Sequence, residues 1–159
     1  MVSNNNSEVV ETVNEGNTLK DQYLTFVIED EEYGIEIANI KEIISICAIT
    51  LIPETPAYLE GIISLRGDII PVINVRKRFL KPPKEYDELT CIIVIEYREY
   101  SLGLVVDAVK EVMYISEENI LPPPSDRLNY YNQFIKNIGR VGESMKLLLD
   151  LDRFLVQDE

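Results

Sequence analysis

The chain has 159 residues, enough for one domain or two very small ones. It contains 15 Lys and Arg against 28 Asp and Glu, and the resulting net charge of -13 argues against binding to nucleic acid or to an anionic membrane surface. The sequence has no histidine, which excludes Ser-His-Asp and Cys-His catalysis and histidine zinc sites. We therefore expect protein partners, no metal or other cofactor, and no enzymatic activity.

Residues 1–20 are polar and rich in asparagine, which predicts a disordered N-terminal tail. They lack the features of a secretion signal, and no apolar run elsewhere is long enough to span a bilayer, so we expect a cytoplasmic protein. Cys47 and Cys91 stand far apart within apolar stretches. This arrangement predicts buried, reduced thiols rather than a metal or redox pair.

Three short segments recur in the same order in the two halves of the chain, which indicates internal duplication. The matching segments are residues 27–35 with 94–104, 37–44 with 106–113, and, more loosely, 72–80 with 148–155. The first match places Gly34 over Gly103 after a two-residue shift.

Short runs of Ile and Val separated by turn signals predict an all-β chain made of small barrels. The turn signals lie at residues 30–32, 53–56, 81–84 and 122–124. We expect two barrels in tandem, the first over residues 21–81 and the second over residues 82–156, with short helical segments. Neither half is large enough to be stable alone, so a shared core or interface is expected.

The run from Gly61 to Val75 predicts a β-hairpin with Arg66 at its turn. Pro71 cannot donate a ladder hydrogen bond, so its strand should be an edge or carry a bulge there. Because a buried, unpaired arginine is costly, Arg66 must be solvated, paired with an acid, or held for a partner. The basic run Arg76-Lys77-Arg78 is interpreted as the solvated face of a short helix.

Five blocks of sequence together resemble the CheW family of bacterial chemotaxis coupling proteins, over roughly residues 20–156. The blocks are Glu32-Tyr33-Gly34-Ile35, Ile40-Lys41-Glu42-Ile43, residues 52–61, residues 65–74 with Leu65-Arg66-Gly67 and Pro71-Val72-Ile73, and Gly103-Leu104-Val105-Val106-Asp107. The hairpin block is shared with the regulatory domain of the kinase CheA and the coupling half of CheV. Since the chain begins and ends close to the matching region, we expect a stand-alone CheW. The resemblance implies two five-stranded SH3-like β-barrels side by side.

The resemblance also implies a non-enzymatic adaptor that links the cytoplasmic tips of methyl-accepting chemotaxis receptors to the regulatory domain of CheA. A receptor helix is expected in an apolar groove at the seam between the barrels. The receptor-binding candidates are Arg66 and Glu42 as polar contacts, with Ile37, Ile40 and Val105 as the groove floor. The kinase-binding candidates are Ile43, Ile49 and Gly61. For each aliphatic residue a place in the core is the alternative, and Gly61 can instead serve a bulge or a close backbone approach.

Two other classes of protein stay open. A generic SH3-like peptide-binding module would show aromatic residues around a groove, but the chain has four Phe and no Trp. A small hydrolase would need a cleft with two carboxyl groups of displaced pKa.

Overall fold

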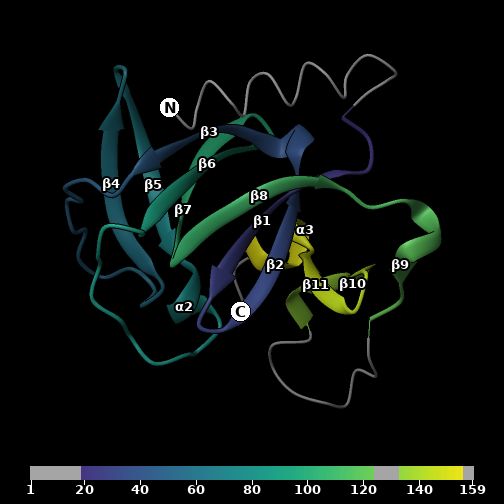
Figure 1. The fold of residues 1–159 in the computed structure, drawn as a ribbon. Helices are drawn as coiled ribbons and strands as arrows, with labels where there is room; N and C mark the ends of the chain where they lie inside the picture. Colours follow the sequence, from purple (N-terminus) through teal and green to yellow (C-terminus); the bar gives the residue numbers. More distant parts are fainter. Residues whose placement is uncertain (1–18, 124–132, 156–159) are drawn as a thin grey trace. The chain divides into compact units, whose positions relative to one another are not determined.

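The computed structural model describes residues 19–123 and 133–155 and shows a mostly β protein with short helical turns, which confirms the all-β prediction (Figure 1). The elements of the first half are β1 (Gln22–Ile28), β2 (Glu31–Glu36), η1 (Ile37–Asn39), β3 (Ile40–Ser45), β4 (Leu59–Leu65), β5 (Asp68–Asn74) and α2 (Val75–Arg78). Those of the second half are β6 (Cys91–Tyr97), β7 (Tyr100–Val106), β8 (Ala108–Tyr114), η2 (Glu117–Asn119), β9 (Ile120–Leu121), β10 (Ile135–Val141), β11 (Ser144–Leu149) and α3 (Leu151–Leu155). Residues 1–18 of the expected tail lie outside the described residues.

The chain forms two compact units, each built on one sheet. Of the described residues, unit 1 contains residues 19–26, 30–38, 110–123 and 133–155, and its sheet has the order β8-β1-β2-β11-β10-β9. Unit 2 contains residues 27–29 and 39–109, and its sheet has the order β3-β6-β7-β5-β4.

These units correct the expected division of the chain into tandem halves. The predicted boundary between residues 81 and 82 lies inside unit 2, and each unit takes strands from both halves. The physical cause is long-range pairing: β2 pairs in parallel with β11, and β7 pairs in parallel with β5. In each sheet two strands of one half therefore lie between strands of the other half: β1 and β2 lie between four strands of the second half, and β6 and β7 lie between three strands of the first half.

The two sheets nevertheless repeat one pattern, as duplication requires. Gly34 of β2 lies opposite Leu148 of β11, and Gly103 of β7 lies opposite Val72 of β5. Unit 1 has a sixth strand, β9. At the corresponding place in unit 2 the chain makes only a single β-bridge. Leu121 of β9 pairs with residue 138 of β10, as Thr50 pairs with residue 62 of β4.

Each unit has its own apolar core. In unit 2 the core consists of buried aliphatic residues from β4 to β7, namely Ile63, Ile70, Val72, Ile92, Val94 and Val105. In unit 1 Tyr23, Ile115 and Leu148 form one cluster, and the rings of Phe134 and Phe154 meet edge to face with centroids 5.7 Å apart. Aliphatic burial of this kind is the main favourable term in folding.

Pro71 lies in β5, which is an inner strand of the sheet rather than an edge strand. It is tolerated there because the pairing of β5 with β7 begins only at Val72, so the missing N–H leaves no gap in that ladder. The bulge of this hairpin lies in β4 instead, between Leu59 and Gly61.

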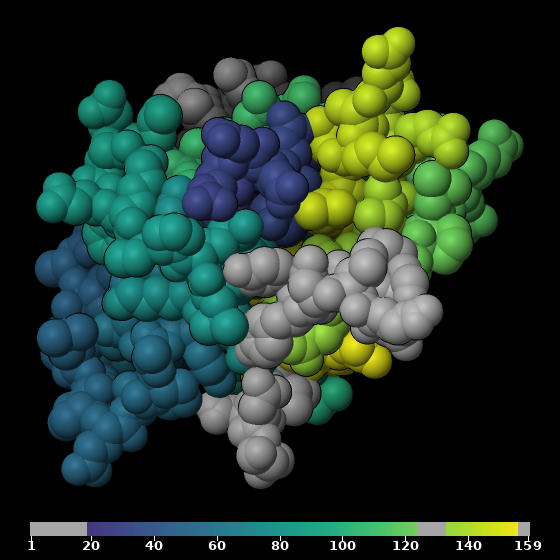
Figure 2. All heavy atoms as spheres, turned by 90° about the horizontal axis from the view of Figure 1, so that it is seen from below, coloured from purple at the N-terminus to yellow at the C-terminus, as the bar shows by residue number. Residues whose placement is uncertain are grey.

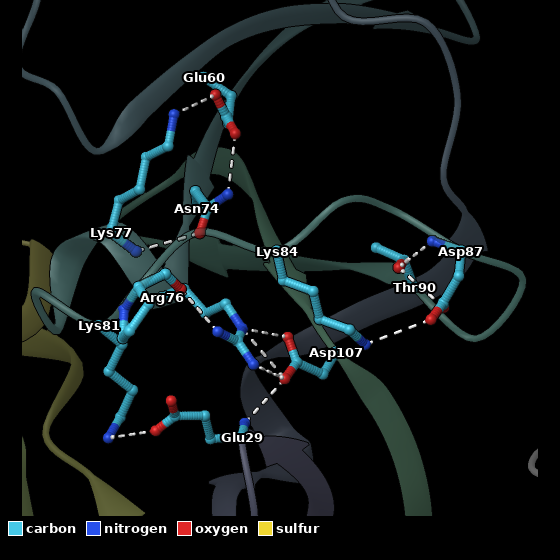
Figure 3. Close-up of polar contacts among 11 residues, drawn as sticks. Glu29, Glu60, Asn74, Arg76, Lys77, Lys81, Lys84, Asp87, Thr90 and Asp107 are labelled. Carbon is cyan, nitrogen blue, oxygen red and sulfur yellow. Dashed lines mark hydrogen bonds and ion pairs between the residues drawn. The ribbon is translucent and has the colours of Figure 1, made fainter.

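A polar network anchors α2 to the rest of unit 2 (Figure 3). The Arg76 Nε donates to Asp107 Oδ1 at 3.0 Å, and the Asp107 carboxylate also accepts from the backbone N–H of Glu29 at 2.7 Å. The Arg76 Nη1 donates to the carbonyl of Pro82 at 2.6 Å, which fixes the start of the linker to β6. Arg78 is only 2% exposed and lies over the Tyr58 ring. The basic run is therefore largely structural, and the prediction that it forms a solvated face is wrong for Arg76 and Arg78.

Candidate functional site

The hairpin of β4 and β5 turns at Arg66 and Gly67, as predicted. Leu65 pairs with Asp68 across this two-residue turn, and Arg66 and Gly67 have φ values of 51° and 88°. Positive φ at both positions is typical of a type I′ turn, which matches the twist of the flanking strands. Arg66 therefore lies at the tip of the hairpin, between the ends of its two strands.

Arg66 is both solvated and paired with an acid. Its side chain is 68% exposed, and its Nη1 donates to the carboxylate of Glu42 on β3. This hydrogen bond and the charge of Glu42 raise the pKa of Arg66. Since β3 and β4 are the two edges of the sheet, the contact shows that the sheet curves until its edges approach one another.

The remaining receptor-binding candidates have different environments. Val105 is 4% exposed and belongs to the core of unit 2, which supports the core alternative for this residue. Ile37 is buried and belongs to unit 1. Ile40 is half-buried at the start of β3, two residues from Glu42. Unit 2 therefore brings Arg66 and Glu42 into contact, and Ile40 lies on the same strand as Glu42.

Among the kinase-binding candidates, Gly61 has a backbone role. Its φ is 146°, and a Cβ added there would lie 2.1 Å from the carbonyl oxygen of Thr50. Thr50 and Ile62 exchange two backbone hydrogen bonds of 2.9 Å, so the glycine permits a close approach of two chain segments. Ile43 is half-buried on the edge strand β3, and Ile49 is half-buried just before Thr50.

Ile49 lines a surface pocket of about 450 Å³ that lies wholly within unit 2. One wall comes from the chain after β3, with Cys47, Ile49 and Leu51, and another comes from the linker after α2, with Tyr86. Figure 2 shows atoms from around residue 50 in blue and from around residue 90 in teal on one face of the molecule.

Glu60 lies at the polar side of this pocket and accepts from three groups. Asn74 Nδ2 and the Tyr86 hydroxyl donate to its Oε2 at 2.8 and 2.6 Å, and Lys77 Nζ donates to its Oε1 at 3.2 Å. Burial by itself would raise the pKa of Glu60, but the three hydrogen bonds outweigh it and lower the pKa. Burial and the same carboxylate raise the pKa of Tyr86 far above its usual range. The contacts of Glu60 with Asn74 and Lys77 are drawn in Figure 3.

The prediction of buried thiols is wrong for Cys47, which is exposed, while Cys91 is half-buried. The Cys91 Sγ donates to the carbonyl of Leu89, and burial raises the pKa of this thiol. Leu51 and Tyr86 of the pocket were missed for different reasons. Leu51 lies in the mostly apolar run of residues 46–52, where local pattern does not separate core from surface, whereas Tyr86 lies in a polar, proline-containing loop. The available signal for Tyr86 was an aromatic residue in an otherwise polar segment.

Residues 19–123 and 133–155 contain no group of three or more Cys, Asp or Glu side chains arranged to hold a metal ion. In the same part of the chain, no helix has the length and apolar composition to cross a membrane.

Comparisons with known proteins identify the family. A model of the CheW-like domain matches residues 22–159. The chain is 34% identical over 144 residues to the chemotaxis protein CheW of Klebsiella aerogenes, covering 91% of this chain and 87% of that protein, and 33% identical to CheW of Treponema pallidum, covering 87% and 84%. The crystal structure of the scaffolding protein TtCheW from Thermoanaerobacter tengcongensis superposes with a TM-score of 0.76 and 36% identity, covering 82% of this chain and 88% of that one. With this match over nearly all of its length, the chain belongs to the CheW-like family of chemotaxis scaffolding proteins.

Proposed function

We propose that this protein is a non-enzymatic chemotaxis adaptor that couples the cytoplasmic tips of methyl-accepting receptors to the regulatory domain of the kinase CheA. Membership of the CheW-like family supports a scaffolding role. The observation that carries the receptor part of the proposal is the position of Arg66, which is 68% exposed at a hairpin turn and makes no contribution to the core.

The receptor contact involves Arg66, Glu42 and Ile40 of unit 2. A guanidinium group offers a planar set of donors to a carboxylate or to carbonyl groups at the end of a helix. Glu42 holds the arginine in one orientation, which lowers the entropy lost on binding. Ile40 supplies an apolar contact from the same strand, whereas Val105 acts through the core.

The kinase contact involves Ile43 and Ile49, which are both half-buried and lie on β3 and the chain that follows it. Gly61 supports this surface through its backbone, because any side chain there would displace Thr50.

The structure offers little support for the other two classes. The pocket of unit 2 has a single aromatic lining residue, Tyr86, where a peptide-binding module would need several. The pKa of Glu60 is lowered rather than raised, so this carboxyl group is not suited to act as a general acid.

The test is reconstitution of kinase control. Autophosphorylation of CheA is measured with receptor fragments, with and without this protein, and we expect receptor control only when the protein is present. If receptor fragments changed autophosphorylation of CheA equally with and without this protein, the adaptor function would be contradicted.

Three variants separate the two surfaces. Arg66→Ala is expected to weaken receptor binding about tenfold while kinase binding is unchanged, since interfacial arginine is a frequent hot spot. Arg66→Lys should restore only part of the affinity, because lysine lacks the planar fork. Ile49→Glu should weaken kinase binding and leave receptor binding intact. A folded variant that loses both affinities equally would indicate one shared site.

A further inference from the structure

Unit 1 contains a pocket of about 320 Å³, a volume within the range of about 300–1,000 Å³ that is typical of small-molecule sites. Its lining comes from both ends of the chain of this unit, from β1 and β2 on one side and from η2 to β11 on the other. Three lining residues are acidic, namely Asp21, Glu36 and Glu117. Ile120 and Leu148 add aliphatic surface between them.

The Tyr23 hydroxyl is an unused polar group of this pocket. Tyr23 is 8% exposed, and within residues 19–123 and 133–155 its hydroxyl has no hydrogen-bond partner. The same part of the chain contains no enclosed side-chain oxygen or nitrogen without a partner, so the hydroxyl opens onto the pocket that Tyr23 lines. Burial and the charges of the same three carboxylates raise the pKa of Tyr23, as expected if they surround its hydroxyl. Leaving such a group unpaired is costly, and a bound donor would remove that cost.

The corresponding place in unit 2 is filled by the core. The glycine in the second strand of each repeat lies against a side chain of the preceding strand, which is Tyr23 in unit 1 and Ile92 in unit 2. Two residues after that glycine the chain has Glu36 in unit 1 and Val105 in unit 2. Ile92 and Val105 are 0% and 4% exposed and belong to the core of unit 2. The repeat in unit 1 therefore has a polar hollow where its counterpart has close aliphatic packing.

The charges around the pocket favour a cation. Lys136 lies 3.7 Å from Glu36, and Lys20 lies 3.3 Å from Glu117, but all four side chains are at least 48% exposed. Exposed ion pairs are weak, so a ligand can replace the lysines. Asp21 makes no ion pair or hydrogen bond through its carboxylate within the described ranges, which leaves one carboxylate without a cation even when both lysines are counted.

The arrangement of the carboxylates favours several separate positive charges over one metal ion. Residues 19–123 and 133–155 contain no group of three Cys, Asp or Glu side chains arranged to hold a metal ion, so the three carboxylates do not converge on one point. A lysine side chain from another protein would offer only one ammonium group. A linear polyamine has ammonium groups separated by short methylene chains, which match the carboxylates and the aliphatic residues between them.

We propose that the pocket of unit 1 binds a linear aliphatic polyamine. Its ammonium groups donate to the carboxylates of Asp21, Glu36 and Glu117 and to the oxygen of the Tyr23 hydroxyl, and its methylene groups lie against the aliphatic lining. The site is contained in unit 1, and the proposal does not depend on the adaptor function.

The first experiment is calorimetric titration of the full-length protein with spermidine, and we expect one equivalent to bind. Because a net charge of -13 attracts any polycation, the control must match the change in charge. Glu117→Gln should weaken binding about fivefold through loss of a charged acceptor. Glu143→Gln changes the charge equally at an exposed residue of unit 1 that does not line the pocket, and it should bind like the parent. Equal weakening in both variants would show general attraction to the acidic surface and overturn the site.

The Tyr23 hydroxyl has its own test. Tyr23→Phe keeps the ring in its cluster with Ile115 and Leu148 but removes the acceptor, so spermidine binding should weaken about threefold. The thermal unfolding midpoint of the free variant should not fall, because the hydroxyl bonds to no described residue. Unchanged affinity would overturn the assignment of this hydroxyl to the site.

The third experiment uses the lysine that competes for the pocket. Lys136→Met removes the cation near Glu36 and should tighten spermidine binding about threefold more than Lys110→Met does. Lys110 is the matched control, because it is similarly exposed and pairs with Glu32 outside the pocket. Equal effects of the two substitutions would overturn the pocket as the binding site.

The ligand class and the location are tested on the parent protein. Butylamine, which carries one ammonium group, should bind at least tenfold more weakly than spermidine, and equal affinity would overturn the polyamine assignment. In amide NMR spectra, spermidine should shift the signals of Gly34 and Asn137, which line the pocket, and leave Gly67 of unit 2 unchanged. Absence of binding, or shifts spread over both units, would overturn the proposal.

Discussion

Gly103 lies opposite Val72 in the parallel pairing of β7 with β5, and a Cβ added to this glycine would meet Ile92 Cγ2 at 2.8 Å and Val72 Cγ2 at 3.4 Å. Its counterpart Gly34 would meet Leu148 Cδ2 at 2.8 Å. The duplicated glycines thus permit the same close approach of strands, but they face different side chains.

The first prediction compares these two glycines. Gly103→Ala should lower the free energy of unfolding by about 2 kcal/mol, because branched side chains with little rotational freedom surround the new methyl group. Gly34→Ala should cost about 1 kcal/mol, because the end of the Leu148 side chain can move aside. Urea unfolding of both variants measures the difference, and an equal or greater cost at Gly34 would contradict it.

The second prediction concerns the turn between β6 and β7. Tyr97 pairs with Tyr100 across Arg98 and Glu99, whose φ values of 51° and 72° place both in the left-handed region. Glu99→Gly should therefore stabilise the protein by about 1 kcal/mol.

The β4–β5 turn supplies the control, because Gly67 holds the position equivalent to Glu99 and has open space around it. Gly67→Ala should destabilise the protein by a similar amount, through backbone strain alone. The thermal unfolding midpoints of the two variants should shift in opposite directions. Shifts of the same sign would show that the positive φ values do not determine how these turns affect stability.

The third prediction separates the structural and functional roles of Arg66. Its ion pair with Glu42 is exposed, so Arg66→Ala should leave the unfolding midpoint nearly unchanged, and the parent protein should show little dependence of stability on salt. Denaturant unfolding at low and high ionic strength tests this. A clearly destabilised variant with normal receptor affinity would assign the arginine to the fold instead.

The fourth prediction concerns acid stability. The folded-state pKa of Glu60 is lowered, so its contribution to stability is present above the ordinary glutamate pKa of about 4.3 and is lost as the pH falls through the lower folded-state value. Glu60→Gln should be less stable than the parent at neutral pH, and the difference should shrink in this acid range.

Glu85→Gln is the control for acid stability, since Glu85 is exposed and lines the same pocket. Its unfolding free energy should follow that of the parent at every pH. A difference between Glu60→Gln and the parent that stays constant on acidification would argue against the three hydrogen bonds as the cause.

The sequence by itself determined the features that depend on local pattern. Alternating Ile and Val runs predicted strands, the Leu-Arg-Gly turn predicted the hairpin that exposes Arg66, and the repeated segments predicted duplicated sheets with Gly34 and Gly103 in equivalent places. Each of these follows from neighbouring residues or from comparison of the chain with itself.

Only the tertiary structure decided which strands share a sheet and which side chains face solvent. The parallel pairings of β2 with β11 and of β5 with β7 join residues far apart in the sequence, so a boundary at the Pro82-Pro83 linker could not reveal the two units. The same pairings bury Val105, while the bridge at Thr50 turns Cys47 and Leu51 toward solvent. All three are apolar residues in apolar or mixed segments, and their exposure depends on long-range contacts that local pattern does not contain.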